Sequence, residues 1–211
     1  MCGIAAYSLS SRSRVGRTLA AQALLAAIAE RGADAVGYAY RSAGETYPTV
    51  VKQRTPASEL LERVSVPEDA THLLVHVRDY TKGHPSLAAN NHPVRHGAVV
   101  GIHNGIIAND EEIFAGHGFE RNEPDMTVDS EAIFALMEEA HHTPKALEEL
   151  HGSMASAWLD ERVDAKTTSV SAVPSQSGRP TPRATKTLPP TRSSSQALAI
   201  DPCSSSSASG V

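Results

Sequence analysis

The sequence predicts sheets covered by helices, in an α+β or layered αββα arrangement. Short apolar runs typical of strands alternate with amphipathic stretches typical of helices from Met1 to about Asp160. No internal repeat is visible in this part of the chain. Strands interrupted by pairs of helices are typical of sheets that carry helices on one face.

Six runs are predicted as strands from their apolar and β-branched residues. They are residues 3–8, 37–41, 46–52, 71–78, 99–103 and 153–160. The fourth run is apolar at residues 73–75 and at Val77, which indicates a strand buried on both faces. The dipeptide Asn104–Gly105, directly after the fifth run, is a strong turn signal.

Three stretches are predicted as helices, namely residues 18–30, 129–140 and 144–150. Leu24 and Ile28 lie on the apolar side of the first helix, and Ile133 and Leu136 lie on that of the second. Pro144 stands at the first position of the third helix, where its missing N–H is tolerated. The last two helices form the pair expected to cover one sheet.

The composition changes abruptly after Arg162. Of the 49 residues from 163 to 211, 12 are Ser, six are Thr and six are Pro, and none is Phe, Trp, Tyr or His. Such a segment lacks the apolar surface needed to order itself. We therefore divide the chain into one domain, residues 1–162, and a low-complexity tail, residues 163–211, that is expected to be disordered.

The distribution of charge limits the possible partners. Residues 163–211 hold five Lys or Arg and two Asp or Glu, a balance of +3, so the total of −5 leaves −8 on residues 1–162. An acidic body argues against nucleic-acid binding. No apolar run approaches the roughly 20 residues that span a membrane, and a signal-peptide pattern is absent. We expect a cytoplasmic protein without a cofactor.

Cys2 is a candidate nucleophile. It and Cys203 are nearly the whole chain apart and do not suggest a disulfide framework. If Met1 is removed, Cys2 carries both a thiol and the free α-amine, whose ordinary pKa of about 7.7–8.0 lets it accept the thiol proton, directly or through water. A single cysteine at this position is a weak signal by itself.

Six motifs along the chain strengthen this interpretation. In order they are MCGI at 1–4, RGADAVG at 31–37, HVRDYTKG at 76–83, NNHP at 90–93, HNGIIAN at 103–109 and DSE at 129–131. Together they resemble the signatures of the class II glutamine amidotransferases, most closely the glutaminase domain of glucosamine-6-phosphate synthase, over about residues 2–160. The resemblance implies the four-layer αββα sandwich of the N-terminal-nucleophile (Ntn) hydrolases.

The resemblance also implies roles for individual residues. Cys2 would attack the side-chain amide of glutamine, and the Asn104 side chain and Gly105 backbone N–H would stabilise the oxyanion that forms. Arg78 and Asp129 would bind the α-carboxylate and α-ammonium groups of glutamine. A planar guanidinium and a carboxylate suit these two charges.

A loop after the arginine would pack over the substrate. Thr81 and Gly83 match the family at this loop. Asp79, Tyr80 and Lys82 depart from it, because the family usually has tryptophan, alanine and histidine at these positions. We expect this difference to affect the packing of the loop and the affinity for substrate more than the chemistry.

Several of these residues also have a purely structural interpretation. Asn104 can belong to a turn, Arg78 can be a surface residue after a strand, and Asp129 can cap a helix. His92 matches the histidine of the family's Asn-x-His-Pro motif and is expected to be structural. The pair His92 and His96, like the pair at 141–142, offers too few ligands for zinc, so no metal site is expected.

The expected function is the glutaminase half-reaction, in which a γ-glutamyl thioester forms on Cys2 and ammonia is released to an acceptor domain or synthase subunit in another chain. The family pattern is lost after residue 160, so we expect a sandwich incomplete at its C-terminal strands, as from a truncated gene or a shifted reading frame. Two alternatives stay open. One is a catalytically silent fragment that binds glutamine or a protein, and the other is an amide hydrolase with a different substrate.

Overall fold

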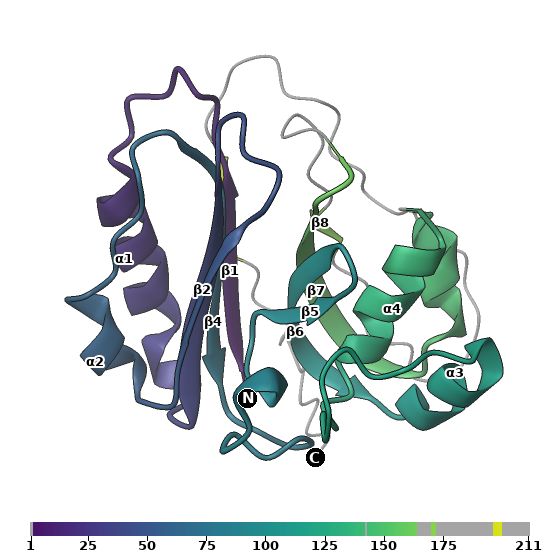
Figure 1. Ribbon diagram of the computed structural model, residues 1–211. Helices are drawn as coiled ribbons and strands as arrows, with labels where there is room; N and C mark the ends of the chain where they lie inside the picture. Colours follow the sequence, from purple (N-terminus) through teal and green to yellow (C-terminus); the bar gives the residue numbers. More distant parts are fainter. Residues whose placement is uncertain (1, 142, 164–169, 172–195, 200–211) are drawn as a thin grey trace, which may run out of the picture.

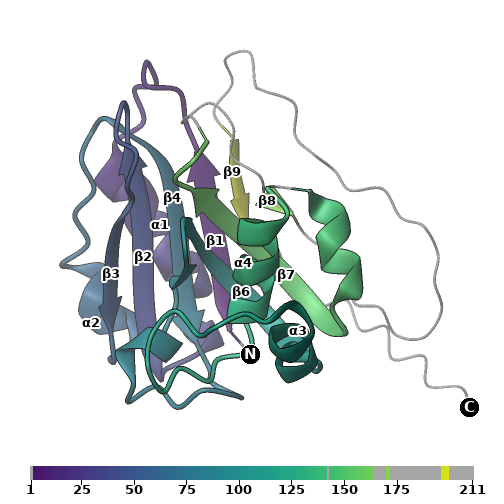
Figure 2. The ribbon, with the colours of Figure 1, turned by 45° about the vertical axis from the view of Figure 1, so that its right-hand side comes forward.

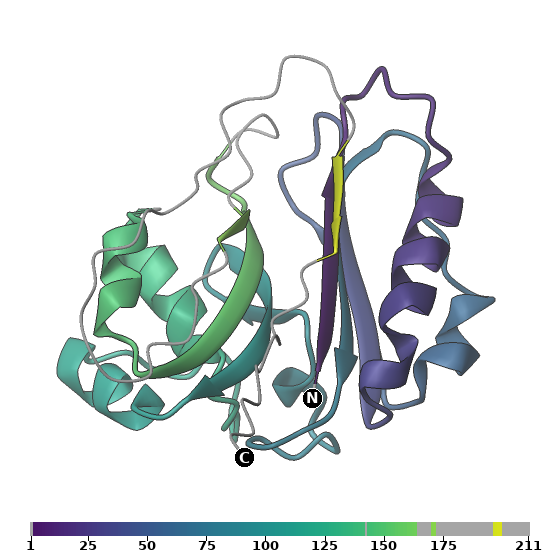
Figure 3. The same cartoon turned by 180° about the vertical axis from the view of Figure 1, so that it is seen from behind.

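The computed structural model describes residues 2–141, 143–163, 170–171 and 196–199. These residues form two antiparallel sheets that face each other, with helices on the outer face of each sheet (Figure 1; Figure 3 shows the same layers from behind). The αββα layering predicted from the sequence is confirmed.

The first sheet has the strand order β3-β2-β4-β1-β9. Its strands are β1 (Gly3–Ser8), β2 (Ala35–Ser42), β3 (Thr49–Gln53), β4 (Ala70–Arg78) and β9 (Gln196–Ala199). Its outer face is covered by α1 (Arg17–Ile28), which continues into the short 3₁₀ helix η1 (Ala29–Arg31), and by α2 (Ala57–Leu61). The central strand β4 is buried along its whole length, as its apolar run predicted.

The second sheet has the order β5-β6-β7-β8. Its strands are β5 (Val94–His96), β6 (Val99–Ile107), β7 (Gly152–Asp160) and β8 (Val170–Ser171). Its outer face is covered by α3 (Asp110–His117), α4 (Glu131–Glu139) and the 3₁₀ helix η3 (Pro144–Glu149). Another 3₁₀ helix, η2 (Ala88–Asn90), lies in the connection from the first sheet to the second.

Three apolar clusters fill the spaces between these layers. One lies between the first sheet and α1 and α2, and includes Leu25 and Leu73. A second lies between the second sheet and its helices, and includes Phe134 and Trp158. The third, between the two sheets, is smaller and contains Ile4, Ala6, Leu74, Ile102, Ala155, Ala157 and Leu159. In β1, β4 and β7, alternate residues therefore face a helix layer or the opposite sheet.

The structure departs from the predicted elements at one informative place. The expected turn at Asn104–Gly105 is wrong, because β6 continues through both residues to Ile107 and pairs with β7 over its full length. Gly105 has φ 139°, and a Cβ there would collide with the carbonyl oxygen of Ser153. The dipeptide therefore gives the strand an unusual backbone conformation rather than ending it.

Some elements were not predicted at all. The helices α2 and α3 and the strand β5 are short, and α3 has only Ile113 and Phe114 as large buried apolar residues, so their periodicity is weak. Within the predicted tail, β8 pairs with β7 and β9 pairs with β1 (Figure 2). The remaining tail residues, 164–169, 172–195 and 200–211, lie outside the described residues.

None of the helices among the described residues has the length and apolar character needed to cross a bilayer.

Candidate active site

Cys2 directly precedes β1 of the first sheet. The pairing of Gly3 with Val77 places it beside the end of β4. Its Sγ lies 3.3 Å from the carbonyl oxygen of Asp79 and 3.4 Å from the Asp79 backbone nitrogen. Arg31 Nε donates to the Cys2 carbonyl oxygen at 3.2 Å. Both the thiol and the backbone of Cys2 are therefore held in place.

The surroundings of Cys2 keep its thiol protonated. Burial raises the pKa of Cys2, while the hydrogen bond from the Asp79 backbone and the positive charge of Arg78 act in the opposite direction without reversing the shift. A thiol with a raised pKa is a weak nucleophile at neutral pH. Chemistry at Cys2 therefore needs a base to take the proton.

Arg78, the last residue of β4, is a buried cation next to Cys2, with 2% of its surface exposed. It donates to Asn91 Oδ1 at 2.9 Å and to the carbonyl oxygens of Lys82, at 2.8 Å, and Gly83. Burial lowers the pKa of Arg78, while the charges of Cys2 and Asp129 raise it. No carboxylate among the described residues forms an ion pair with Arg78, so its charge is available for a ligand.

Asp129 lies on the segment that leads into α4 and points toward β6. Its Oδ2 accepts a hydrogen bond of 2.7 Å from the backbone N–H of Ile107. The N-cap of α4 is Ser130, and Asp129 makes no capping hydrogen bond. The structural interpretation of Asp129 as a helix cap is therefore wrong.

The loop after Arg78 packs against the segment that carries Asp129. A Cβ at Gly83, whose φ is 78°, would lie 2.9 Å from the Val128 Cα, so the approach requires glycine. Asn90 Oδ1 accepts hydrogen bonds from the backbone nitrogens of Thr127 and Val128, at 2.9 and 3.1 Å. The two oppositely charged candidates, Arg78 and Asp129, thus lie on packed neighbouring segments.

Asn104 and Gly105 lie on β6, in the sheet opposite Cys2. His76 on β4 contacts the carbonyl oxygen of His103 through Nε2 at 3.0 Å, which joins the two sheets next to Asn104. The Asn104 side chain is 7% exposed. Among the described residues, none hydrogen-bonds to its amide group. An amide without a protein partner can donate to and accept from a ligand.

Six of the seven predicted site residues are linked to one another by contacts, packed segments or a shared strand, and one is not. Cys2, Arg78, Gly83 and Asp129 are connected by direct contacts or by packed segments, and Asn104 and Gly105 lie on the strand whose Ile107 binds Asp129. Thr81 is exposed, and its side chain makes no hydrogen bond with any described residue.

Sequence reasoning missed the residues that support this group. Asn91 orients Arg78 and also donates to the carbonyl oxygen of Pro85 at 2.8 Å. Asp110, on α3, forms an ion pair with Lys82, and Arg31 donates a hydrogen bond to the Cys2 carbonyl oxygen. Arg31 and Asn91 belong to the motifs quoted above, which was the available signal, whereas nothing near Asp110 in the sequence pointed to Lys82.

Buried histidines line the space between the sheets. His76 and His92 are stacked with ring centroids 4.1 Å apart. Burial lowers the pKa of His76 to about 3 and that of His92 well below its usual value. Burial also lowers the pKa of His103, whose Nδ1 lies 2.8 Å from Ser130 Oγ. These rings are neutral at physiological pH. No group of three or more potential ligands among the described residues is arranged to hold a metal ion.

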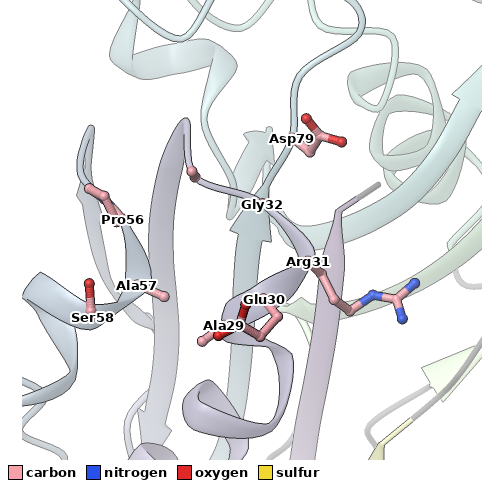
Figure 4. Close-up of a pocket in the computed structure, with 9 residues that line it drawn as sticks. Ala29, Glu30, Arg31, Gly32, Pro56, Ala57, Ser58 and Asp79 are labelled. Atoms are coloured by element: carbon pink, nitrogen blue, oxygen red, sulfur yellow. The ribbon is translucent and has the colours of Figure 1, made fainter.

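An open cavity of about 470 Å³ lies between η1 and the start of α2 (Figure 4). It is lined by η1, by the start of α2 and by Asp79. Figure 4 shows the Arg31 side chain pointing away from Pro56 and Ser58. The lining includes neither Cys2 nor Asn104, so we do not assign this cavity as the reaction site.

Residues 77–171 match the family model described as "Glutamine amidotransferase domain". The chain is also similar to the solved structure of glutamine phosphoribosylpyrophosphate (PRPP) amidotransferase from B. subtilis complexed with ADP and GMP. The identity is 16% and the TM-score 0.52, over 76% of this chain and 35% of that one. A second similar structure is described as the allosteric regulatory enzyme of purine biosynthesis, with 18% identity and a TM-score of 0.56, over 76% of this chain and 36% of that one. Among curated proteins, no relative matches.

These comparisons support the fold and give a family match over part of the chain. The chain shares its fold with these two solved structures, which agrees with the layered αββα architecture expected from the motifs. The family match covers less than half of the chain, and the similarity to the solved structures concerns the fold. The chain spans about a third of the length of the solved structures that it matches.

Proposed function

We propose that this chain hydrolyses the side-chain amide of glutamine at Cys2 and releases ammonia. The observation that carries the proposal is the contact of the Cys2 thiol with the Asp79 backbone nitrogen, next to the buried guanidinium of Arg78. Burial lowers the pKa of the same guanidinium, and the negative charge of Asp129 acts against that shift. A nucleophile and two opposite charges, from distant parts of the sequence, are gathered at one place. Free glutamine presents the matching set, an amide, a carboxylate and an ammonium group.

The α-amine of Cys2 is the base in this mechanism. Removal of Met1 frees the amine, which then accepts the thiol proton as the bond between Sγ and the amide carbon forms. Burial raises the pKa of the thiol, so a neighbouring base is needed near neutral pH. An amine with an ordinary pKa of about 7.7–8.0 is suited to this proton transfer.

The oxyanion of the tetrahedral intermediate is bound by the Asn104 side chain and the Gly105 N–H. Asn104 is buried and makes no side-chain hydrogen bond to a described residue, so its amide is available for this interaction. Donors fixed where charge develops stabilise the transition state more than the ground state.

The intermediate then collapses to products. The carbon–nitrogen bond breaks, the leaving nitrogen takes the proton from the α-amine, and ammonia departs. A γ-glutamyl thioester remains on Cys2. Water attacks the thioester with the α-amine again as base, and glutamate leaves as the thiol regains its proton. Arg78 and Asp129 hold the α-carboxylate and α-ammonium groups throughout.

The ammonia is used by an acceptor domain elsewhere in a longer polypeptide or in another chain. The chain spans only about a third of the length of the similar structures, so the rest of those chains is long enough to contain a further domain. The expected likeness to glucosamine-6-phosphate synthase stays a prediction, and the identity of the acceptor is open within this proposal.

Covalent labelling of the purified protein with a diazo-ketone analogue of glutamine tests the proposal. Peptide mass mapping should find the label on Cys2, and intact mass should show that Met1 is removed. Cys2→Ala should reduce glutamate release to background. Cys203→Ala is the matched control and should retain activity.

Four results would contradict the proposal. Labelling at Cys203, or activity in Cys2→Ala, would exclude Cys2 as the nucleophile. Binding of glutamine without labelling or turnover would favour the catalytically silent fragment. Turnover of other amides in preference to glutamine would favour the third alternative.

A further inference from the structure

The loop that orients Arg78 is anchored by a charged side chain on the far side of the site. Lys82 Nζ lies 2.7 and 2.9 Å from the two carboxylate oxygens of Asp110, the first residue of α3. It also lies 3.2 Å from Glu111 Oε1. The Lys82 side chain is 35% exposed and that of Asp110 only 2%, so the contact with Asp110 is the shielded one.

The same lysine contributes directly to the position of Arg78. The carbonyl oxygens of Lys82 and Gly83 both accept hydrogen bonds from one guanidinium nitrogen of Arg78. A shift of this loop would remove two of the three hydrogen bonds that hold the guanidinium. The Lys82 side chain therefore fixes, through its own backbone, the direction in which Arg78 points.

Asp110 is in turn connected to the segment that carries Asp129. Arg121 donates to Asp110 Oδ2 at 3.2 Å, and through its other terminal nitrogen to the carbonyl oxygen of Val128 at 3.0 Å. Val128 directly precedes Asp129. Lys82, Asp110 and Arg121 thus form a continuous chain of charges between the loop beside Arg78 and the residue before Asp129.

From this geometry we propose that Lys82 is a positioning residue for glutamine recognition, which holds Arg78 in register with Asp129 by binding Asp110. The inference rests on the proposed function, because it takes Arg78 and Asp129 as the groups that bind glutamine. Lys82 does not touch the reacting atoms. We call the ion pair between Lys82 and Asp110 the clamp.

The clamp should affect binding more than turnover. Asp79, whose backbone contacts the Cys2 thiol, is held in place without Lys82. The carbonyl oxygen of Arg78 accepts a hydrogen bond from the Asp34 backbone nitrogen at 3.0 Å, and the Tyr80 backbone nitrogen donates to Asp34 Oδ2 at 2.8 Å. Loss of the Lys82 charge therefore releases the guanidinium while the nucleophile keeps its place. Groups that bind ground and transition states equally change KM rather than kcat.

Lys82→Met tests the inference, because it removes the charge and keeps an unbranched side chain. We expect KM for glutamine to rise about two- to fivefold, the upper part of the range for a partly exposed ion pair. The value of kcat should stay within about twofold, since the groups that act only on the transition state are unchanged. Arg78 should react faster with phenylglyoxal, as measured by peptide mapping.

Control variants test whether the changes in KM and Arg78 reactivity come from the ion pair between Lys82 and Asp110. Lys145→Met removes an exposed lysine on η3 and should leave both readouts at wild-type values. Lys82→Arg should restore them. Glu111, with 81% of its side chain exposed, should matter little when changed to Gln. In Asp110→Asn, the further change Lys82→Met should add no effect.

The outcomes separate this inference from the proposed function. If the wild type turns over glutamine but Lys82→Met leaves KM and Arg78 reactivity unchanged, the clamp is wrong and the proposed function stands. A fall in kcat with KM unchanged would also overturn the positioning role. If the wild type neither binds nor hydrolyses glutamine, both proposals are overturned, even if Arg78 becomes more reactive in Lys82→Met.

Discussion

The outer layers of the sandwich and the layer between its sheets are built from different residues. Among the described residues, the two sheet–helix clusters contain 17 and 18 buried apolar side chains, whereas the cluster between the sheets contains seven. The inner layer instead holds buried polar groups, including His76, Arg78 and Asn104. Apolar burial at the outer layers stabilises the fold, and the inner layer provides the polar groups that chemistry needs.

Strand β4 shows how one element serves both layers. Leu73, Val75 and Val77 face α1 and α2 and belong to the apolar cluster there. The alternate residues include His76 and Arg78, which face the opposite sheet. Since side chains alternate across a strand, a single strand can stabilise the outer layer and carry charged groups in the inner one.

If the outer layer provides stability, truncation of its core should unfold the protein without altering its chemistry. Phe134→Ala should reduce the free energy of unfolding by about 3–5 kcal/mol, because the ring is fully buried against Gly101 and leaves a cavity. Urea unfolding measures the loss. Leu19→Ala, at a residue that is 71% exposed, is the control and should change little.

A change at Asn104, in the inner layer, should lower activity while leaving stability almost unchanged. Asn104→Ala should lower kcat for glutamine about 10²–10³-fold, equivalent to about 2.7–4 kcal/mol of transition-state stabilisation. The urea midpoint should barely move, because the side chain makes no hydrogen bond to a described residue. A large loss of stability with normal turnover would show that Asn104 has only a structural role.

Asp129→Asn should distinguish substrate binding from catalysis within the same layer. We expect KM for glutamine to rise by about tenfold or more, because a charge-assisted contact to the α-ammonium group is lost. Turnover at saturation should fall much less. Steady-state kinetics measure both values, and a lower kcat with unchanged KM would argue against an ammonium-binding role.

The inner layer should also respond to acid. Burial lowers the pKa of His72 to about 4 and that of His76 to about 3, whereas an unfolded histidine titrates near 6.5. The unfolded state therefore binds more protons below about pH 6.5, and stability present above that pH is lost as pH falls toward 4. Each such histidine contributes up to about 1.4 kcal/mol per pH unit.

Urea unfolding between pH 7 and 4.5 measures this slope. His72→Gln should make it shallower, and His84→Gln, at an exposed histidine, should leave it unchanged. Equal slopes in the wild type and His72→Gln would show that buried His72 does not contribute to the acid sensitivity.

Much of the fold could be predicted from local patterns. The apolar run at residues 73–75 and Val77 indicated a buried strand, and the spacing of Ile133 and Leu136 indicated the helix that became α4. Short elements such as α2 and β5 escaped because a few residues carry no measurable periodicity. At Asn104–Gly105 the local turn preference was overridden, because pairing with β7 extends the strand through both residues.

The sequence by itself determined which chemical groups are present and the order in which they occur, since Cys2, Arg78, Asn104 and Asp129 were all identified from motifs. Only the tertiary structure decided which groups meet. The pairing of β1 with β4 brings Cys2 beside Arg78, and the hydrogen bond from Ile107 turns Asp129 toward β6 instead of the end of its helix. The contact between Lys82 and Asp110 joins residues 28 positions apart, and no local pattern encodes it. Such contacts depend on how the layers pack, because packing alone sets the distance between charges on separate elements.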